Sequence, residues 1–148
     1  MKKLLCIGAL LALTFGVANA EVIGVVDFDK IVDNYSKVKS VSNEISDRYA
    51  EIQRYSLDKE REYKKLSTPL ERKNFEETVA RELSKKQEAY LKLKERKEAE
   101  IDTSIKAAIK QVAMESKVTT VVEKSVVFFG GIDLTQKVVQ KLNSPVAK

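Results

Sequence analysis

The sequence has no histidine, no tryptophan and a single cysteine, Cys6, among its 148 residues. The absence of histidine excludes imidazole metal ligands, histidine general bases and Ser-His-Asp triads. Cys6 lies in an N-terminal segment that we expect to be removed, so the mature chain has neither a thiol nor a disulfide. Aspartates and glutamates are plentiful, but no apolar, pocket-forming segment surrounds any of them to raise a carboxyl pKa. The composition predicts a protein that is not an enzyme and that has no metal or cofactor.

Residues 1–20, MKKLLCIGALLALTFGVANA, have the pattern of a secretory signal peptide. Two lysines precede an apolar run over 4–17, which is shorter than the roughly 18 to 20 residues that a membrane-spanning helix needs. The small-residue exit predicts cleavage between Ala20 and Glu21, which would leave an exported chain. That chain has 25 basic and 22 acidic residues, a net charge of +3, because the signal contains two of the basic ones.

Glycine and proline are too rare to interrupt the middle of the chain. The five glycines are residues 8, 16, 24, 130 and 131, and the two prolines are Pro69 and Pro145. The sequence therefore predicts two long helices, over 29–66 and 69–116. Thr68 followed by Pro69 and Glu71 is the signature of a capping box that starts the second helix. Because a short connection makes neighbouring helices antiparallel, we expect a helical hairpin arm with its tip near 67–69.

Apolar periodicity indicates how the two helices meet. In the first helix, two heptad rows predict a coiled-coil-like seam, and their members are Tyr35, Ser42, Tyr49, Ser56 and Tyr63 in one row and Val38, Ile45, Ile52, Lys59 and Leu66 in the other. In the second helix, Val79, Tyr90, Ile101 and Val112 recur every eleven residues, which predicts a nearly straight stripe. The serines and the lysine in the first helix predict a weakly held outer seam.

The two ends of the mature chain have the composition of strands. The segments 22–27, 118–122 and 125–129 are rich in β-branched and aromatic residues, with a tight turn expected at 123–124 and a final helix over 134–142, capped by Asp133. We predict a body from 21–28 and 117–148, whose core residues are Val22, Val25, Val121, Val122, Val126 and Phe128. Because a sheet of so few strands is only marginally stable alone, we expect copies of the chain to complete the body. The predicted fold class is α+β, mainly helical, with the arm, 29–116, projecting from a small β-body completed by trimerisation.

Two motifs extend this interpretation, VIGVVDFDKIVDNY after the signal and VVEKSVVFFGGIDLTQKVVQKLN at the end. With the helical hairpin between them, the sequence resembles the Skp (OmpH-family) periplasmic chaperones over essentially the whole mature chain. The resemblance implies a periplasmic homotrimer whose arms enclose a cavity. Family members hold unfolded outer-membrane β-barrel proteins there without ATP, which prevents aggregation before membrane insertion. It also makes lipopolysaccharide or a membrane surface a further candidate partner.

Two sets of arm residues are candidates for binding unfolded clients. The aromatic candidates are Tyr49, Tyr63, Phe75 and Tyr90, whose amphipathic rings could contact client strands. The basic candidates, which could attract acidic clients, are Lys59, Arg61, Lys64, Lys65, Arg72, Lys73, Lys85 and Lys86. Each set has a structural alternative, because aromatics at helical spacing also form helix seams and interleaved charges also form a solvated face.

Two other functions compete with the chaperone interpretation. An exported structural coiled coil that organises the envelope would explain the arm but not the strands that flank it. Nucleic-acid binding is suggested by the pI of about 9.2. Export, the small net charge of the mature chain and the absence of an aromatic-basic motif count against nucleic acid as a partner.

Overall fold

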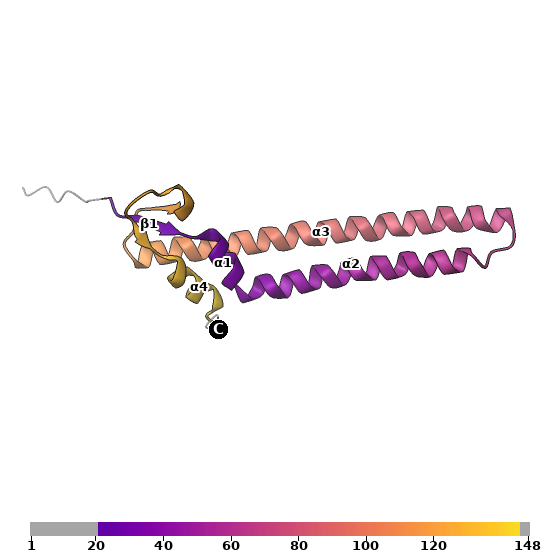
Figure 1. The fold of residues 1–148 in the computed structure, drawn as a ribbon, viewed down its shortest axis with the longest axis horizontal. Helices are drawn as coiled ribbons and strands as arrows, with labels where there is room; N and C mark the ends of the chain where they lie inside the picture. Colours follow the sequence, from indigo (N-terminus) through magenta and orange to yellow (C-terminus); the bar gives the residue numbers. More distant parts are fainter. Residues whose placement is uncertain (1–20, 146–148) are drawn as a thin grey trace, which may run out of the picture.

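The chain runs outward along one long helix, turns, and returns along a second helix to the place where it started (Figure 1). This computed structural model describes residues 21–145, so the predicted signal peptide, with Ala20, and residues 146–148 lie outside the described part. In chain order the elements are β1 (Ile23–Val26), α1 (Phe28–Asn34), α2 (Ser36–Tyr63), α3 (Pro69–Glu115), β2 (Thr120–Glu123), the 3-10 helix η1 (Lys124–Val126), β3 (Ile132–Asp133) and α4 (Thr135–Asn143). The fold is the predicted one in outline: a helical arm with a small β-sheet at its base.

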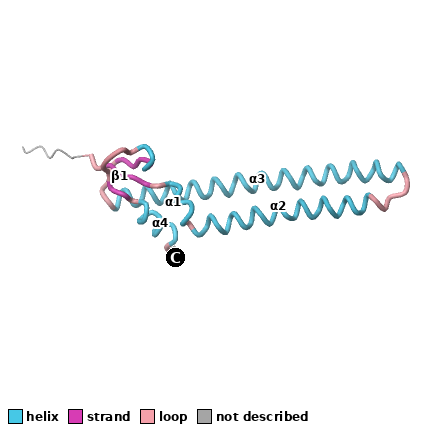
Figure 2. The backbone as a smooth tube through the Cα atoms, viewed as in Figure 1, coloured by secondary structure: helices cyan, strands magenta, loops and turns pink. Residues whose placement is uncertain are grey.

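The tip of the arm has the predicted capping box. The Thr68 hydroxyl accepts a hydrogen bond from the Glu71 amide at 3.2 Å, and the Glu71 carboxylate accepts one from the Thr68 amide at 3.0 Å. Pro69 occupies the first turn of α3, where its missing amide hydrogen costs nothing. The guanidinium of Arg72 donates to the Leu66 carbonyl at 2.9 and 3.1 Å, which ties the loop to the start of α3. The turn lies at the end of the arm remote from the sheet (Figure 2).

The seam of the arm matches one predicted heptad row and corrects the other. Val38, Ile45, Ile52, Lys59 and Leu66 are all buried or half-buried. In the other predicted row, Ser42, Tyr49 and Ser56 are exposed, so that row is wrong for the middle of the helix. Val41 and Tyr55, two heptads apart, are the inward-facing residues instead. In α3 the eleven-residue stripe through Val79, Tyr90, Ile101 and Val112 is buried or half-buried, as predicted.

The predicted first helix is interrupted near its start. Tyr35 has extended backbone angles, φ −87° and ψ 109°, between α1 and α2. Its ring is buried in the base of the molecule, with 8% of its surface exposed. The separate helix α1 packs against α4, so the arm proper begins with α2.

The sheet differs from the predicted topology. Its strand order is β2-β1-β3, and β1 pairs in parallel with both neighbours, Ile23 opposite Thr120 and Gly24 opposite Ile132. The predicted tight turn at 123–124 and strand at 125–129 are wrong, because η1 and an irregular segment occupy this region. Parallel neighbours cannot be joined by a tight turn, so the segment after β2 must cross to the far side of β1. Gly130 and Gly131, both at φ 89°, supply the left-handed backbone for its last bend.

The main core cluster lies at the base, where α1, α4, the sheet and the end of α3 meet, while Val41 and Ile52 are buried separately in the arm. The fully buried side chains of the cluster are Ile31, Ile105, Val112, Leu134 and Val138. Close packing leaves no room for a side chain at Gly24, where an added Cβ would lie 2.8 Å from Leu134 Cδ1 and 2.9 Å from Val118 Cγ1.

The predicted body-core residues fall into two groups in the single chain. Val25 is 5% exposed, and Val22, Val121 and Val122 are half-buried. Val126 and Phe128 are instead 76% and 107% exposed, which corrects their expected burial within one chain. They face outward because they belong to the segment after β2 rather than to a strand.

Truncation of the core should destabilise the base strongly. Ile105→Ala removes a fully buried side chain, and we expect a loss of about 2 to 5 kcal/mol in the free energy of unfolding. Leu91→Ala, at a position 61% exposed on the same helix, should change it by less than about 0.5 kcal/mol. Urea denaturation at one fixed chain concentration measures both. Equal effects of the two variants would contradict the placement of the core.

Candidate functional site

The four aromatic candidates form two pairs across the arm. The rings of Tyr49 and Tyr90 lie 5.9 Å apart, and those of Tyr63 and Phe75 lie 6.3 Å apart. Each pair joins α2 to α3, so these side chains contribute to the seam. Tyr49 is nevertheless 53% exposed, so part of its ring is available to a partner. Client contact through these rings stays a prediction.

The basic candidates near the tip are partly neutralised by neighbours. Lys59, Arg61 and Lys64, in the last turns and at the C-cap of α2, form salt bridges to Glu62, Asp58 and Glu60, at 2.7, 3.2 and 2.6 Å. Pairs this exposed contribute little to stability, but they reduce the local positive field. Within the part of the chain that the structure describes, Lys65, Lys73, Lys85 and Lys86 are exposed and form no salt bridge, so these four remain the better steering candidates. Arg72 also forms no salt bridge there, but its guanidinium is bound to the Leu66 carbonyl.

A side-chain hydrogen bond across the outer seam, here called the polar clasp, was not predicted from the sequence. The Tyr55 hydroxyl donates a hydrogen bond to the Glu82 carboxylate across the two helices. Burial, together with this hydrogen bond, raises the pKa of Tyr55 to about 12. The ammonium groups of Lys59 and Lys86 lie 5.6 and 4.9 Å from the Tyr55 ring centre. In the sequence, Tyr55 follows Val41 by two heptads, and this spacing could have indicated that Tyr55 faces α3.

Further toward the base, the seam contains an ion pair. Lys97, with 20% of its side chain exposed, lies 2.8 Å from the Glu44 carboxylate across the helices. The hydrogen bond from Lys97 holds the pKa of Glu44 below its ordinary value. Between Ile52 and Ile105 no side chain is buried. The outer arm is therefore held by half-buried and polar contacts, which implies low local stability.

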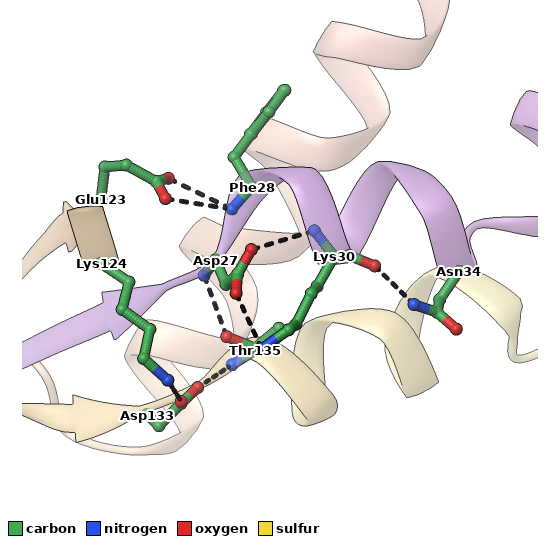
Figure 3. Close-up of polar contacts among 8 residues, drawn as sticks. All are labelled: Asp27, Phe28, Lys30, Asn34, Glu123, Lys124, Asp133 and Thr135. Carbon is green, nitrogen blue, oxygen red and sulfur yellow. Dashed lines mark hydrogen bonds and ion pairs between the residues drawn. The ribbon is translucent and has the colours of Figure 1, made fainter.

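Two carboxylates accept hydrogen bonds from amides in the first turn of α1 (Figure 3). Asp27 Oδ1 accepts a hydrogen bond from the Lys30 amide at 3.0 Å, as a side-chain N-cap does. The Glu123 carboxylate, at the end of β2, accepts from the Phe28 amide at 3.2 and 3.3 Å. These bonds connect the first turn of α1 to the strand that precedes it and to the strand beside it.

A second group of contacts fixes the start of α4 (Figure 3). Asp133 accepts a hydrogen bond from the Thr135 amide at 2.9 Å and forms an ion pair with Lys124 at 2.8 Å. The Thr135 hydroxyl in turn accepts from the Asp27 amide at 3.0 Å. The hydrogen bonds from Lys124 and Thr135 lower the pKa of Asp133 to about 2. Leu134, rather than the predicted Asp133, occupies the N-cap position of α4, and Asp133 binds the first helical amide from one residue further out.

Asn143, the last residue of α4, bridges the break between α1 and α2. Its side-chain oxygen accepts hydrogen bonds from the Ser36 amide at 3.0 Å and the Ser36 hydroxyl at 2.8 Å. Its amide nitrogen donates to the Asn34 carbonyl at 2.8 Å. Tyr35, the N-cap of α2, makes no side-chain capping bond of its own. Asn143 therefore caps the arm from a distant element and fixes the direction in which the arm leaves the base.

Within residues 21–145 no three His, Cys, Asp or Glu side chains are grouped so that they could hold a metal ion. None of the helices in the described range combines the length and apolarity needed to cross a bilayer. Glu21, on the mature side of the predicted cleavage site, accepts a hydrogen bond from the Thr120 hydroxyl at 2.8 Å and so lies beside the sheet.

The fold and these contacts define a class of protein in which a long two-helix arm extends from a small mixed base. The family model described as outer membrane protein (OmpH-like) matches residues 22–142, most of the chain. The chain therefore belongs to the OmpH-like family. No curated protein matches it in a sequence search.

Removal of the Asn143 side chain should loosen the arm at its root. We expect Asn143→Ala to lower the free energy of unfolding by about 1 kcal/mol, as loss of a helix cap does. It should also broaden the distance distribution between spin labels on cysteines introduced at Ser67 and Gln136, in chains diluted with unlabelled protein. Because the predicted mature chain has no cysteine, these labels are unique. Asn43→Ala, at an exposed position of α2, should leave the distribution unchanged, and an equally narrow distribution in Asn143→Ala would contradict the capping role.

The Asp133 contacts should make the base sensitive to acid. The folded-state pKa of about 2 lies below the ordinary value of 3.8, so the ionised carboxyl stabilises the fold above about pH 4. This contribution is lost as the pH falls toward 2. We expect Asp133→Asn to melt below the wild-type temperature at pH 7, with the gap closing between pH 4 and pH 2. A gap that is absent at pH 7, or unchanged at pH 2, would contradict this assignment.

Proposed function

We propose that this protein is an ATP-independent periplasmic holdase, which binds unfolded outer-membrane β-barrel proteins between helical arms and prevents their aggregation before membrane insertion. Membership of the OmpH-like family supports a periplasmic chaperone-type function. One observation supports this most: the largest fully buried side chains all lie in the base, while the arm between Ile52 and Ile105 has no buried side chain. Walls with few buried contacts adapt to clients of different shape and release them without nucleotide.

A cavity requires more than one arm, and the base supports the proposed homotrimer. Large apolar side chains are exposed there, and they are Ile23, Val126, Phe128, Phe129 and Ile132. Exposed apolar patches of this kind mark interaction sites. Both β2 and β3 are edge strands, and free strand edges readily pair with another chain. Packing of three bases would cover this surface and leave three arms projecting from it.

An exported structural coiled coil remains the alternative. It would use the arm as a spacer, and such a spacer is usually held by a continuous apolar seam. The polar clasp of Tyr55 and Glu82 and the ion pair of Glu44 and Lys97 interrupt the seam here. We therefore favour the holdase.

Assembly can be tested separately from folding. Val126 is exposed and lies outside the strands, so Val126→Asp should leave the chain folded while it prevents the bases from packing, because a bare charge would be buried in the contact. Sedimentation should give about three times the mature chain mass for the wild type and for the arm control Leu57→Asp. It should give the monomer mass for Val126→Asp. A wild-type monomer at micromolar concentration would contradict the trimer.

The holdase activity is tested by dilution of a urea-unfolded outer-membrane β-barrel protein into buffer with and without the purified protein. We expect the wild type, without ATP, to suppress light scattering at about one trimer per client. Val126→Asp should suppress it far less, because single arms enclose no cavity. If scattering rises as fast with the wild type as without it, the structural coiled coil is the better explanation.

A further inference from the structure

A groove of about 640 Å³ lies between α2 and α3 in the middle part of the arm. Its floor is apolar, formed by Ile52, Tyr90 and Leu93, which are buried or half-buried. The exposed ring of Tyr49 pairs with Tyr90 and extends the apolar surface. The volume lies in the range of pockets that hold small ligands or a few side chains.

The rim of the groove is strongly basic. Arg48, Lys86, Lys92 and Arg96 line it, against one carboxylate, Glu51. The excess of three positive charges equals that of the whole predicted mature chain, which has 25 basic and 22 acidic residues. The residues that line the groove thus have a net charge of +3.

The four cations of the rim are not equally available. Arg48 forms a salt bridge with Glu51 at 2.9 Å, and Lys92 forms one with Glu88 at 2.6 Å. In residues 21–145, no carboxylate lies within 4.0 Å of the charged groups of Lys86 and Arg96. Lys86 instead lies 4.9 Å from the Tyr55 ring centre. Lys86 and Arg96 therefore lack an anionic partner. In the sequence of α3, Lys86 precedes and Arg96 follows the floor residues Tyr90 and Leu93.

We propose that this groove binds an extended client segment in which a carboxylate side chain lies between apolar ones. Strands of membrane β-barrels alternate apolar and polar residues, so an unfolded barrel presents such segments. The apolar side chains would cover Ile52, Tyr90 and Leu93, and the carboxylate would pair with Lys86 and Arg96. This inference rests on the proposed holdase function and states which side chains of a client the groove would recognise. A concave, narrow surface between two helices suits an extended chain better than a flat lipid surface.

The test uses the full mature protein and three labelled ten-residue peptides with blocked ends. The first alternates leucine with aspartate and serine, the second has asparagine in place of aspartate, and the third has serine in place of leucine. We expect fluorescence polarisation at physiological salt to show at least tenfold tighter binding of the first peptide than of either other, because charge-assisted contacts and apolar contacts both contribute. The double variant Lys86→Gln/Arg96→Gln should weaken binding of the first peptide about tenfold or more.

The matched control is Lys39→Gln/Lys110→Gln, which removes the same charge from exposed positions that do not line the groove and are not steering candidates. It should retain the wild-type affinity, because salt screens distant exposed charges. Equal weakening in both double variants, or equal binding of the aspartate and asparagine peptides, would overturn the groove as a specific site. The proposal would also be overturned if the wild type bound phosphatidylglycerol vesicles but none of the peptides, and if Lys86→Gln/Arg96→Gln abolished that vesicle binding.

The outcomes also separate this inference from the proposed function. If the wild type suppresses client aggregation but does not bind the first peptide, the groove assignment is wrong and the holdase stands. If the peptide binds in the groove but aggregation is not suppressed, the site stands and the holdase does not.

Discussion

The parallel pairing of β1 with strands from the other end of the chain is the constraint on which the architecture depends. Ile23–Val26 lies between Thr120–Glu123 and Ile132–Asp133. Parallel neighbours need a long crossover connection, and here the connection from β1 to β2 is the whole arm. Because the start of α2 and the end of α3 must both lie beside one sheet, the two helices have to lie antiparallel. The tight fit of Gly24 against Leu134 and Val118 fixes how α4 covers this sheet.

This constraint divides the molecule into two mechanical parts. The base has close packing around Ile105, Leu134 and Val138 and a set of mutual caps involving Asp27 and Asp133. The arm has a half-buried seam that contains polar side chains. Asn143 connects the two parts, because it belongs to α4 yet caps α2. A rigid base that directs a compliant arm is the arrangement that the proposed holdase function calls for.

Local signals in the sequence predicted local features well. The capping box at Thr68, the long helices and the eleven-residue stripe of α3 depend on neighbouring residues, and all are present. The break at Tyr35 could not be predicted, because the residue that caps α2 lies 107 positions away. The segment 125–129 has the composition of a strand, but strand composition reports a partly buried apolar environment rather than pairing. In the single chain, Val126, Phe128 and Phe129 of this segment are exposed, and the proposed trimer would bury them.

The candidate binding surface was only partly visible in the sequence. Tyr90 and Lys86 were recognised as candidates, but their apposition to Ile52 and Arg48 follows from how α2 and α3 face each other. Hydrogen exchange of the assembled protein tests the central claim, a rigid base and a compliant arm, most directly. The account predicts slow exchange for amides of 23–26 and 105–113 and much faster exchange for 55–66 and 69–90. Amides of β1 that exchange as fast as those of the arm tip would contradict it.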